Sequence, residues 1–256
     1  LFLFVLLSLI TKWIVLSYYF DNDIITNTIM SIKDIQYFPL IINISNLDFS
    51  PSYLDDIKNS NIISFPIYGI ILHSIFYKFF GIYSFIILEF LFQFIFFFVF
   101  YLTINSIFKD SNKTLFFCVL ILISTLILKF LYNNFGIDYL KFLYDSFNDN
   151  FGTRVPRPLI TGIFYFLFYL SIFRLKDNIK AKLNFKYFFP IIFLLSTFIN
   201  SYFYYFINFS ILFVFLFFLY SKNKTLKIFL NNKKLFFILF IFFIIFISPF
   251  ILQLYF

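Results

Sequence analysis

The sequence predicts an all-α, polytopic integral membrane protein, and three observations support this prediction. Hydrophobic residues make up 62% of the 256-residue chain and charged residues only 12%. The apolar residues fall in runs of about 20, the length that an α-helix needs to cross a bilayer. The net charge is +8, and many of the Lys and Arg residues gather in two linkers, as expected of cytoplasmic loops. We expect about seven transmembrane helices in a single domain, with juxtamembrane helices in the first outer loop.

Composition argues against several kinds of site. The chain has one cysteine, Cys118, and one histidine, His73, which excludes an internal disulfide and argues against a thiolate or zinc centre. The five glycines form no G-x-G-x-x-G or P-loop motif, so no nucleotide-binding fold is expected. The chain begins at Leu1 and ends at Phe256 within an apolar run, and we expect it to be a fragment.

The first element is the apolar run over residues 1 to 20. No small-residue cleavage site follows this run, so we expect it to be retained as a membrane span. Asp21 and Asp23 come directly after it, where the span leaves the bilayer. The next full crossing begins only at residue 83, which makes residues 21 to 82 a long outer loop.

Within this loop, residues 62 to 80 are apolar but are expected to lie at the membrane surface rather than to cross it. Ser64 suits an N-cap, Pro66 suits the first helical turn, and Gly81 ends the helix. The juxtamembrane helix predicted over 66–80 spans about 22 Å, which is less than a hydrocarbon core of about 30 Å. A crossing here would also place the acidic loop on the same side as the N-terminus.

Six further spans are predicted over residues 83 to 256. Two basic linkers are expected in the cytoplasm, and their cations are Arg174, Lys176, Lys180, Lys182, Lys186, Lys222, Lys224, Lys227, Lys233 and Lys234. Between them, residues 187 to 220 would form a single helix of about 51 Å, so they must be two spans with an outer turn near Asn200 and Ser201. Successive spans must cross in opposite directions, so the earlier spans can be assigned by working back from the first basic linker. They are 83 to 107, 114 to 133 and 158 to 173, with 134 to 157 outside.

Two opposite charges lie at nearly the same depth within predicted spans. Lys12 lies eight residues before the outer end of the first span, and Glu89 lies six residues after the start of the next one. Both are therefore about 9 to 12 Å deep. Opposite charges on neighbouring helices offset much of the cost of burial. We expect a structural Lys12–Glu89 ion pair that packs these helices together; the alternative is a protonated Glu89 that faces an active-site cavity.

The order of these features resembles the GT-C superfamily of polyprenyl-phosphate-sugar glycosyltransferases. An apolar helix, Asp21-Asn22-Asp23 and a long loop precede Ser64-Phe65-Pro66-Ile67-Tyr68-Gly69 and then Lys78-Phe79-Phe80-Gly81. Members of that superfamily have an acidic pair near the start of the first outer loop and a P-x-Y…K-x-F-G juxtamembrane helix. The acidic stretch here is D-N-D, whereas many relatives have adjacent carboxylates, so either Asp can act. Residues 152 to 158 and 201 to 206 resemble segments of bacterial membrane proteins of this general type.

The resemblance implies an enzyme of the bacterial plasma membrane that transfers a sugar from a polyprenyl-phosphate donor to an extracytoplasmic acceptor. Asp23 or Asp21 would be the general base; otherwise they are solvated carboxylates that end a span. Arg154 and Arg157, with Lys78, would bind the donor phosphate. The two arginines can instead be interfacial anchors. Some members use a divalent cation, so a carboxylate-bound cation is compatible with the resemblance, and no other cofactor is expected.

Two other functions stay open. A transporter or flippase for lipid-linked or small polar substrates would also have many spans, but it would place charges near the bilayer midplane in both halves. A polymerase or ligase of surface polysaccharide would perform similar chemistry with larger outer loops placed later in the chain. The expected partners are the lipid-linked sugar donor and membrane lipids, with no nucleic acid.

Overall fold

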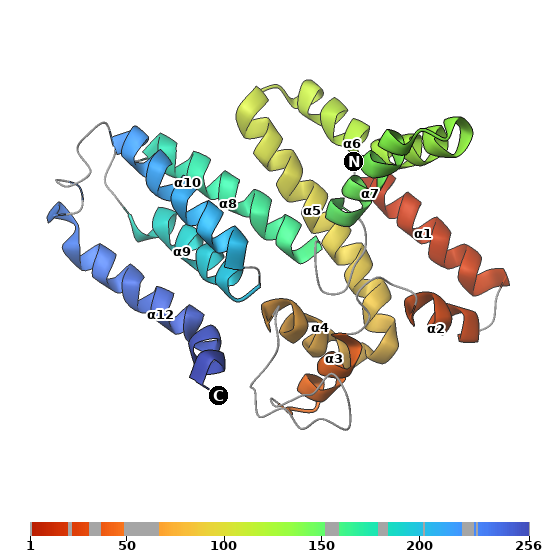
Figure 1. Cartoon of the computed structure of the whole chain (residues 1–256), viewed down its shortest axis with the longest axis horizontal. Coiled ribbons are helices and arrows are strands. Elements are labelled where there is room, and N and C mark those ends of the chain that lie inside the picture. The colour runs from red at the N-terminus through yellow and green to blue at the C-terminus, as the bar shows by residue number, and fades with distance from the viewer. Residues whose placement is uncertain are drawn as a thin grey trace.

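The computed structural model of the chain is built from helices (Figure 1). It describes residues 2–19, 22–30, 37–48, 67–151, 159–178, 184–201, 203–221, 228 and 230–255. These residues contain no β-strand, which confirms the predicted all-α class. In chain order the helices are α1 (Phe2–Tyr19), α2 (Asn22–Met30), α3 (Phe38–Ser45), α4 (Ile67–Phe80), α5 (Ser84–Phe108), α6 (Ser111–Phe135), α7 (Asp138–Phe151), α8 (Leu159–Asn178), α9 (Phe185–Ile199), α10 (Phe203–Ser221) and α12 (Lys233–Tyr255).

Three helical segments among the described residues are long and apolar enough to cross a membrane: Ile67–Phe108, Phe203–Ser221 and Lys233–Leu252. Two shorter apolar helices, Ser111–Ile121 and Phe185–Ile199, accompany them. In α10 and α12 only 6% of the apolar window is buried inside the protein, and about half of the described side chains of each helix are exposed. The segments indicate a helical membrane protein.

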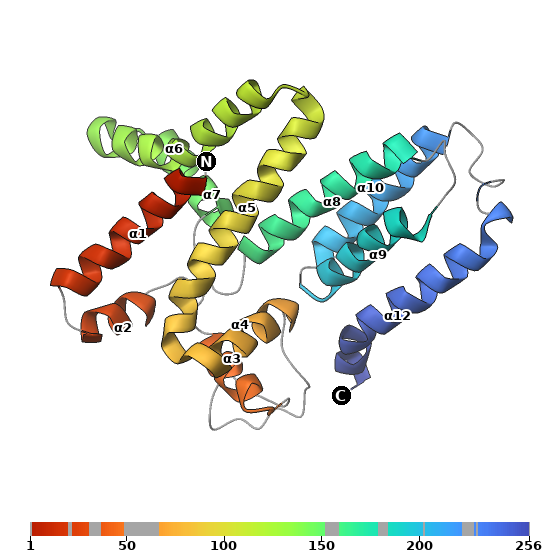
Figure 2. The same cartoon turned by 180° about the vertical axis from the view of Figure 1, so that it is seen from behind.

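The longest of these segments bends at Gly81. α4 ends there, and the 3-10 turn η2 (Gly81–Tyr83) leads into α5. Gly81 has a φ of +56°, in the left-handed region that glycine adopts without the strain of a side chain. α4 therefore lies across the beginning of α5 (Figure 1 and Figure 2). The 25 residues of α5 span about 37 Å and can cross a membrane alone, whereas the 14 residues of α4 span about 21 Å.

Helices α1 to α5 share one hydrophobic cluster, here called the N-terminal core. Its buried members are Trp13, Ile25, Ile29, Tyr37, Leu40, Ile41, Ile44, Ile67, Ile70 and Phe85. The short helix α2 contributes Ile25 and Ile29, which lie one turn apart and give it a buried face. α3 packs against α4. The described helices of the predicted outer loop are therefore folded against α1 and α5.

A second cluster, the C-terminal core, joins α8, α9, α10 and α12. α9 lies at its centre and packs against the other three helices. Aromatic rings fill much of this core; Phe198 of α9, for example, stacks on Phe209 of α10 with centroids 4.7 Å apart, an arrangement that adds to the free energy of burial. A third cluster joins α5 to α8 between the two cores, and its buried members are Leu88, Phe92, Phe96, Phe97 and Ile163.

The predicted turn near Asn200 and Ser201 is confirmed, because α9 ends at Ile199 and α10 begins at Phe203. The turn is buried. Its Asn200 carbonyl accepts the Ile67 amide of α4 at 3.2 Å, and its Asn200 Nδ2 donates to the Phe246 carbonyl of α12 at 2.9 Å. The start of α4 and the α9–α10 turn therefore lie at the same end of the molecule, as the predicted topology requires.

α6 and α7 form a helical hairpin beside α5. α6 begins at the N-cap Asp110, whose carboxylate accepts from the backbone amides of Asn112 and Lys113, and it ends at Gly136, where φ is +63°. The predicted span over 114 to 133 lies within α6. The segment predicted to lie outside after this span contains the helix α7, which was not anticipated from the sequence.

Candidate functional site

Asp23 lies in the first turn of α2, soon after the end of α1. Its side chain is exposed, as is that of Asn27 one turn later, whereas Ile25 and Ile29 on the opposite side of the helix are buried in the N-terminal core. A carboxylate in the first turn interacts favourably with the helix dipole. Asp23 is therefore accessible to solvent and is held in a defined place by the packing of α2.

Three predicted site residues lie outside the described residues. Asp21 directly precedes α2, and Arg154 and Arg157 fall between the end of α7 and the start of α8. Their roles as base and phosphate ligands stay predictions.

Lys78 and His73 lie on different faces of α4. Lys78 is exposed in the last turn, where a cation interacts favourably with the helix dipole. His73 is buried; its ring stacks on Phe92 with centroids 5.6 Å apart and meets Phe85 edge to face. Its Nδ1 atom is buried without a hydrogen-bond partner. This burial between aromatic rings indicates that His73 serves packing, and the phosphate-binding role of Lys78 stays a prediction.

Glu89 is buried in α5, where its Oε2 accepts a hydrogen bond from Nε1 of Trp13 at 2.8 Å. Trp13 belongs to α1, so the first helix packs against α5 at the level of Glu89. Lys12 directly precedes Trp13 in α1, but its side chain lies outside the described part of the structure. The Lys12–Glu89 ion pair stays a prediction.

Trp13 was not predicted to be a partner of Glu89. A signal was available, because Trp13 is the only tryptophan of the chain and adjoins a charged residue within an apolar run. A buried indole N–H needs an acceptor, and a carboxyl group at matching depth on the next span could provide one. Trp13 and Glu89 together form a polar contact between α1 and α5 within the apolar helices.

No metal centre is assigned. Within the described ranges, no three or more His, Cys, Asp or Glu side chains are grouped so that they could hold a metal ion. Cys118, the sole cysteine, is buried in α6.

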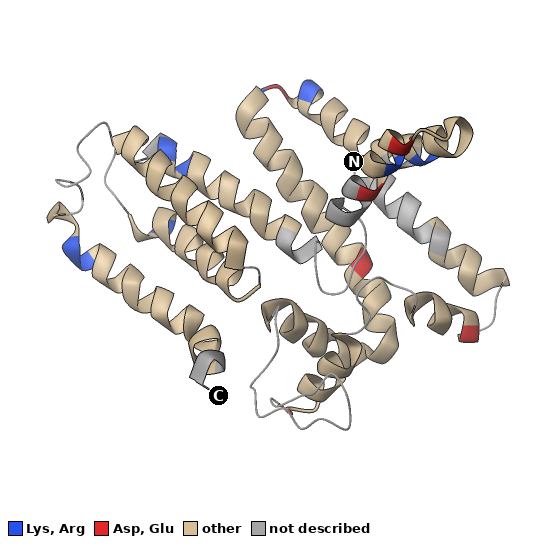
Figure 3. Cartoon of the chain, viewed as in Figure 1, with Lys and Arg blue, Asp and Glu red and all other residues tan. Residues whose placement is uncertain are grey.

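Basic residues gather at one end of the C-terminal helices (Figure 3). These residues are Arg174 and Lys176 near the end of α8, Lys186 in α9, and Lys233 and Lys234 at the start of α12. The Asn200 turn and α4 lie at the opposite end of the same helices (Figure 1). The described cations of the two basic linkers are thus on one side of the helix bundle, and the helices of the predicted outer loop are on the other.

Comparisons with known proteins find no matching family model, no similar curated protein and no similar solved structure. The function therefore has to be inferred from the arrangement of the chain's own residues.

Proposed function

We propose that the chain is a membrane glycosyltransferase that moves a sugar from a polyprenyl-phosphate donor to an extracytoplasmic acceptor. The observation that carries this proposal is the position of Asp23, an exposed carboxylate just beyond α1 on a helix anchored in the N-terminal core. A lipid-linked donor approaches through the bilayer, so its phosphate and anomeric carbon lie near the membrane surface. A carboxylate held where a span ends is within reach of that region.

The proposed topology has seven spans, formed by α1, α5, α6, α8, α9, α10 and α12. The shortest is α9, whose 15 residues span about 22 Å, no more than the juxtamembrane helix predicted over 66–80; it is counted as a span because it is enclosed by α8, α10 and α12, with Lys186 at one end and the buried Asn200 turn at the other. Placing the basic end of the helices in the cytoplasm of a bacterial cell directs α4 and the Asn200 turn outward, and both lie at the opposite end. α4 is then the juxtamembrane helix of a GT-C-like fold, which agrees with its bend away from α5 at Gly81.

The proposed reaction needs few groups. An acceptor hydroxyl attacks the anomeric carbon, and its proton passes to the carboxylate of Asp23, or of Asp21. The bond between the anomeric carbon and the phosphate oxygen breaks, and the phosphate takes the electron pair. Arg154, Arg157 and Lys78 would stabilise the negative charge that this phosphate gains.

The test of the base is the Asp23→Asn variant, assayed in proteoliposomes for transfer of labelled sugar from a polyprenyl-phosphate-sugar donor. Loss of a general base is expected to lower the rate about 100-fold or more, with unchanged thermal unfolding. Asp48→Asn is the matched control, because Asp48 is another exposed carboxylate of the same loop, and this variant should keep its activity. If Asp23→Asn, Asp21→Asn and the double variant all retain full activity, the base lies elsewhere.

The test of the phosphate ligands is the Arg154→Ala/Arg157→Ala variant. It should weaken donor binding more than acceptor binding, because a guanidinium group contacts the charged end of the donor. An unchanged dissociation constant for the donor would assign both arginines to the anchoring role.

A further inference from the structure

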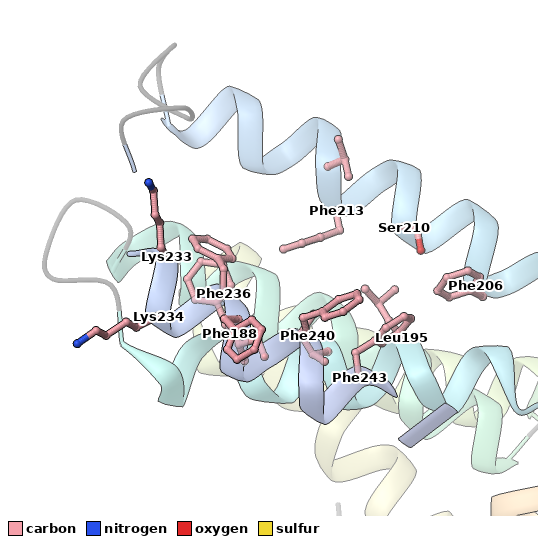
Figure 4. A pocket seen from close by; sticks show the side chains of 14 residues that line it. Phe188, Leu195, Phe206, Ser210, Phe213, Lys233, Lys234, Phe236, Phe240 and Phe243 are labelled. Carbon is pink, nitrogen blue, oxygen red and sulfur yellow. The ribbon is translucent and has the colours of Figure 1, made fainter. Parts of the chain in front are cut away.

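A groove of about 910 Å³ lies among α9, α10 and α12 (Figure 4). We call it the α10–α12 groove. Apart from Ser210, Lys233 and Lys234, every residue that lines it is apolar, and most of these are phenylalanines. A non-helical protein segment docked there would find few partners for its backbone polar groups, whereas hydrocarbon chains need none. The lining therefore favours a lipid chain over an extended polypeptide, and the two lysines favour an anionic ligand over an apolar helix.

The two ends of the groove differ in chemistry. At one end, Phe206 of α10 stacks on Phe243 of α12 with ring centroids 6.2 Å apart, and a second stacked pair of phenylalanines lies beyond it. Lys233 and Lys234 lie at the other end (Figure 4), and both side chains are exposed. An amphiphile with an anionic headgroup and apolar tails matches this polarity.

The length of the groove corresponds to one leaflet of a bilayer. Lys233 and Phe243 are ten residues apart in α12, which is about 15 Å along the helix. Half of a hydrocarbon core of about 30 Å is also about 15 Å. Lipid can reach the groove from the side, because α10 and α12 each have only 6% of their apolar window buried.

We infer that the α10–α12 groove binds one anionic phospholipid, with its acyl chains against α9, α10 and α12 and its phosphate at Lys233 and Lys234. Lys176 in the last turn of α8 and Lys186 at the start of α9 belong to the same basic end of the helices and add to the positive potential there (Figure 3). In the proposed topology this end faces the cytoplasm, so the site is separate from the outer face on which the sugar donor would react. The inference does not depend on the glycosyltransferase activity.

The experiment places a fluorescent reporter in the groove of the intact chain. Phe240 lines the groove, whereas its neighbour Ile241 is exposed and does not. The Phe240→Trp and Ile241→Trp variants are reconstituted in nanodiscs of phosphatidylcholine with increasing amounts of either brominated phosphatidylglycerol or brominated phosphatidylcholine, and the signal of the unsubstituted protein is subtracted. Phe240→Trp should be quenched at a much lower fraction of brominated phosphatidylglycerol than of brominated phosphatidylcholine, and Ile241→Trp equally by both.

The headgroup preference is then tested in the Phe240→Trp background. Each lysine near an anionic headgroup is expected to contribute about fivefold in affinity, so Lys233→Gln/Lys234→Gln should lower the preference for phosphatidylglycerol by about 25-fold. The matched control Lys176→Gln/Lys186→Gln removes the same charge from the same end of the helices, outside the groove. It should lower the preference far less.

Three results would each overturn the inference. Equal quenching of Phe240→Trp by the two brominated lipids would show that the groove does not select an anionic headgroup. An equal loss of preference in both lysine double variants would assign the effect to the general positive potential. Absence of quenching of Phe240→Trp by either lipid would show that a protein segment or a second copy fills the groove.

Discussion

The carbonyl group of Phe246 accepts hydrogen bonds from two other parts of the fold. We predict that removing both donors lowers the free energy of unfolding by more than the sum of the two single removals. Pro249, three residues further along α12, lacks an amide hydrogen and disturbs the helical hydrogen-bond ladder. The amide that Pro249 lacks would have bonded to the Ile245 carbonyl, four residues earlier, and the disturbance extends to the adjacent carbonyl of Phe246. Tyr68 of α4 donates its hydroxyl at 2.7 Å, and Asn200 donates its Nδ2 at 2.9 Å.

The expected magnitudes follow from this shared acceptor. Tyr68→Phe or Asn200→Leu removes one donor and leaves the other, so each should cost about 0.6 kcal/mol, the average for a hydrogen bond between membrane helices. Asn200→Leu also removes a hydrogen bond to the Ser196 carbonyl, which lowers stability. The same substitution removes the buried Oδ1 atom that has no hydrogen-bond partner, which raises stability, so these two effects oppose each other. The double variant leaves the Phe246 carbonyl without either donor, which adds about 1 to 3 kcal/mol.

The assay is unfolding by SDS titration in mixed micelles, from which the free energy of unfolding of each variant is obtained. Tyr101→Phe and Ser17→Ala form the control pair, because both hydroxyl groups make their hydrogen bonds at exposed positions away from α12. Each control should cost less than about 0.5 kcal/mol, and the two should be additive. Additivity of Tyr68→Phe and Asn200→Leu within about 0.5 kcal/mol would refute the shared-acceptor argument.

Three further predictions concern other parts of the chain. A hydrogen bond from the backbone amide of Lys113 lowers the pKa of Asp110. The stabilisation of α6 by the Asp110 carboxylate should therefore be complete at neutral pH and fade as the pH falls below about 4. The difference in Tm between the unsubstituted protein and Asp110→Ala should shrink over that range. For the predicted ion pair, Lys12→Met and Glu89→Gln should each lower the free energy of unfolding, and the double variant should lower it by less than the sum of the two single effects. Strictly additive effects would show that the ion pair does not form. Single cysteines at Asn46 and Tyr83, both exposed, should react with an impermeant thiol reagent from outside the cell, and labelling at Asn46 only from the cytoplasm would reverse the topology.

The helical class and several helix ends could be predicted because they depend on local signals. The turn at Asn200 followed from length alone, since no single helix of 34 residues fits across a bilayer. The end of α4 followed from Gly81, whose positive φ is the conformation that a glycine at a helix end favours.

The helices α2 and α7 could not be predicted from apolar runs, because both contain many polar residues. α2 has only nine residues, too few for a stable helix in isolation, and it is stabilised by burying Ile25 and Ile29 in the N-terminal core. The Trp13–Glu89 hydrogen bond and the α10–α12 groove depend on which helix faces align. Such alignment is a property of the folded chain rather than of any one segment.

α4 links the half of the molecule that carries Asp23 to the half that carries the α10–α12 groove. Ile67 and Ile70 bury their side chains in the N-terminal core, while the Ile67 amide and the Tyr68 hydroxyl bond to the Asn200 turn and to α12. The bonds at this junction are few and directional, so a shift of α12 relative to α9 would have to break them or move α4. Because α4 also packs against α3 and α5, such a movement would reach the N-terminal core, in which Ile25 and Ile29 anchor α2. We therefore expect the hydrogen bonds between α4 and α12 to help hold the helix that carries Asp23.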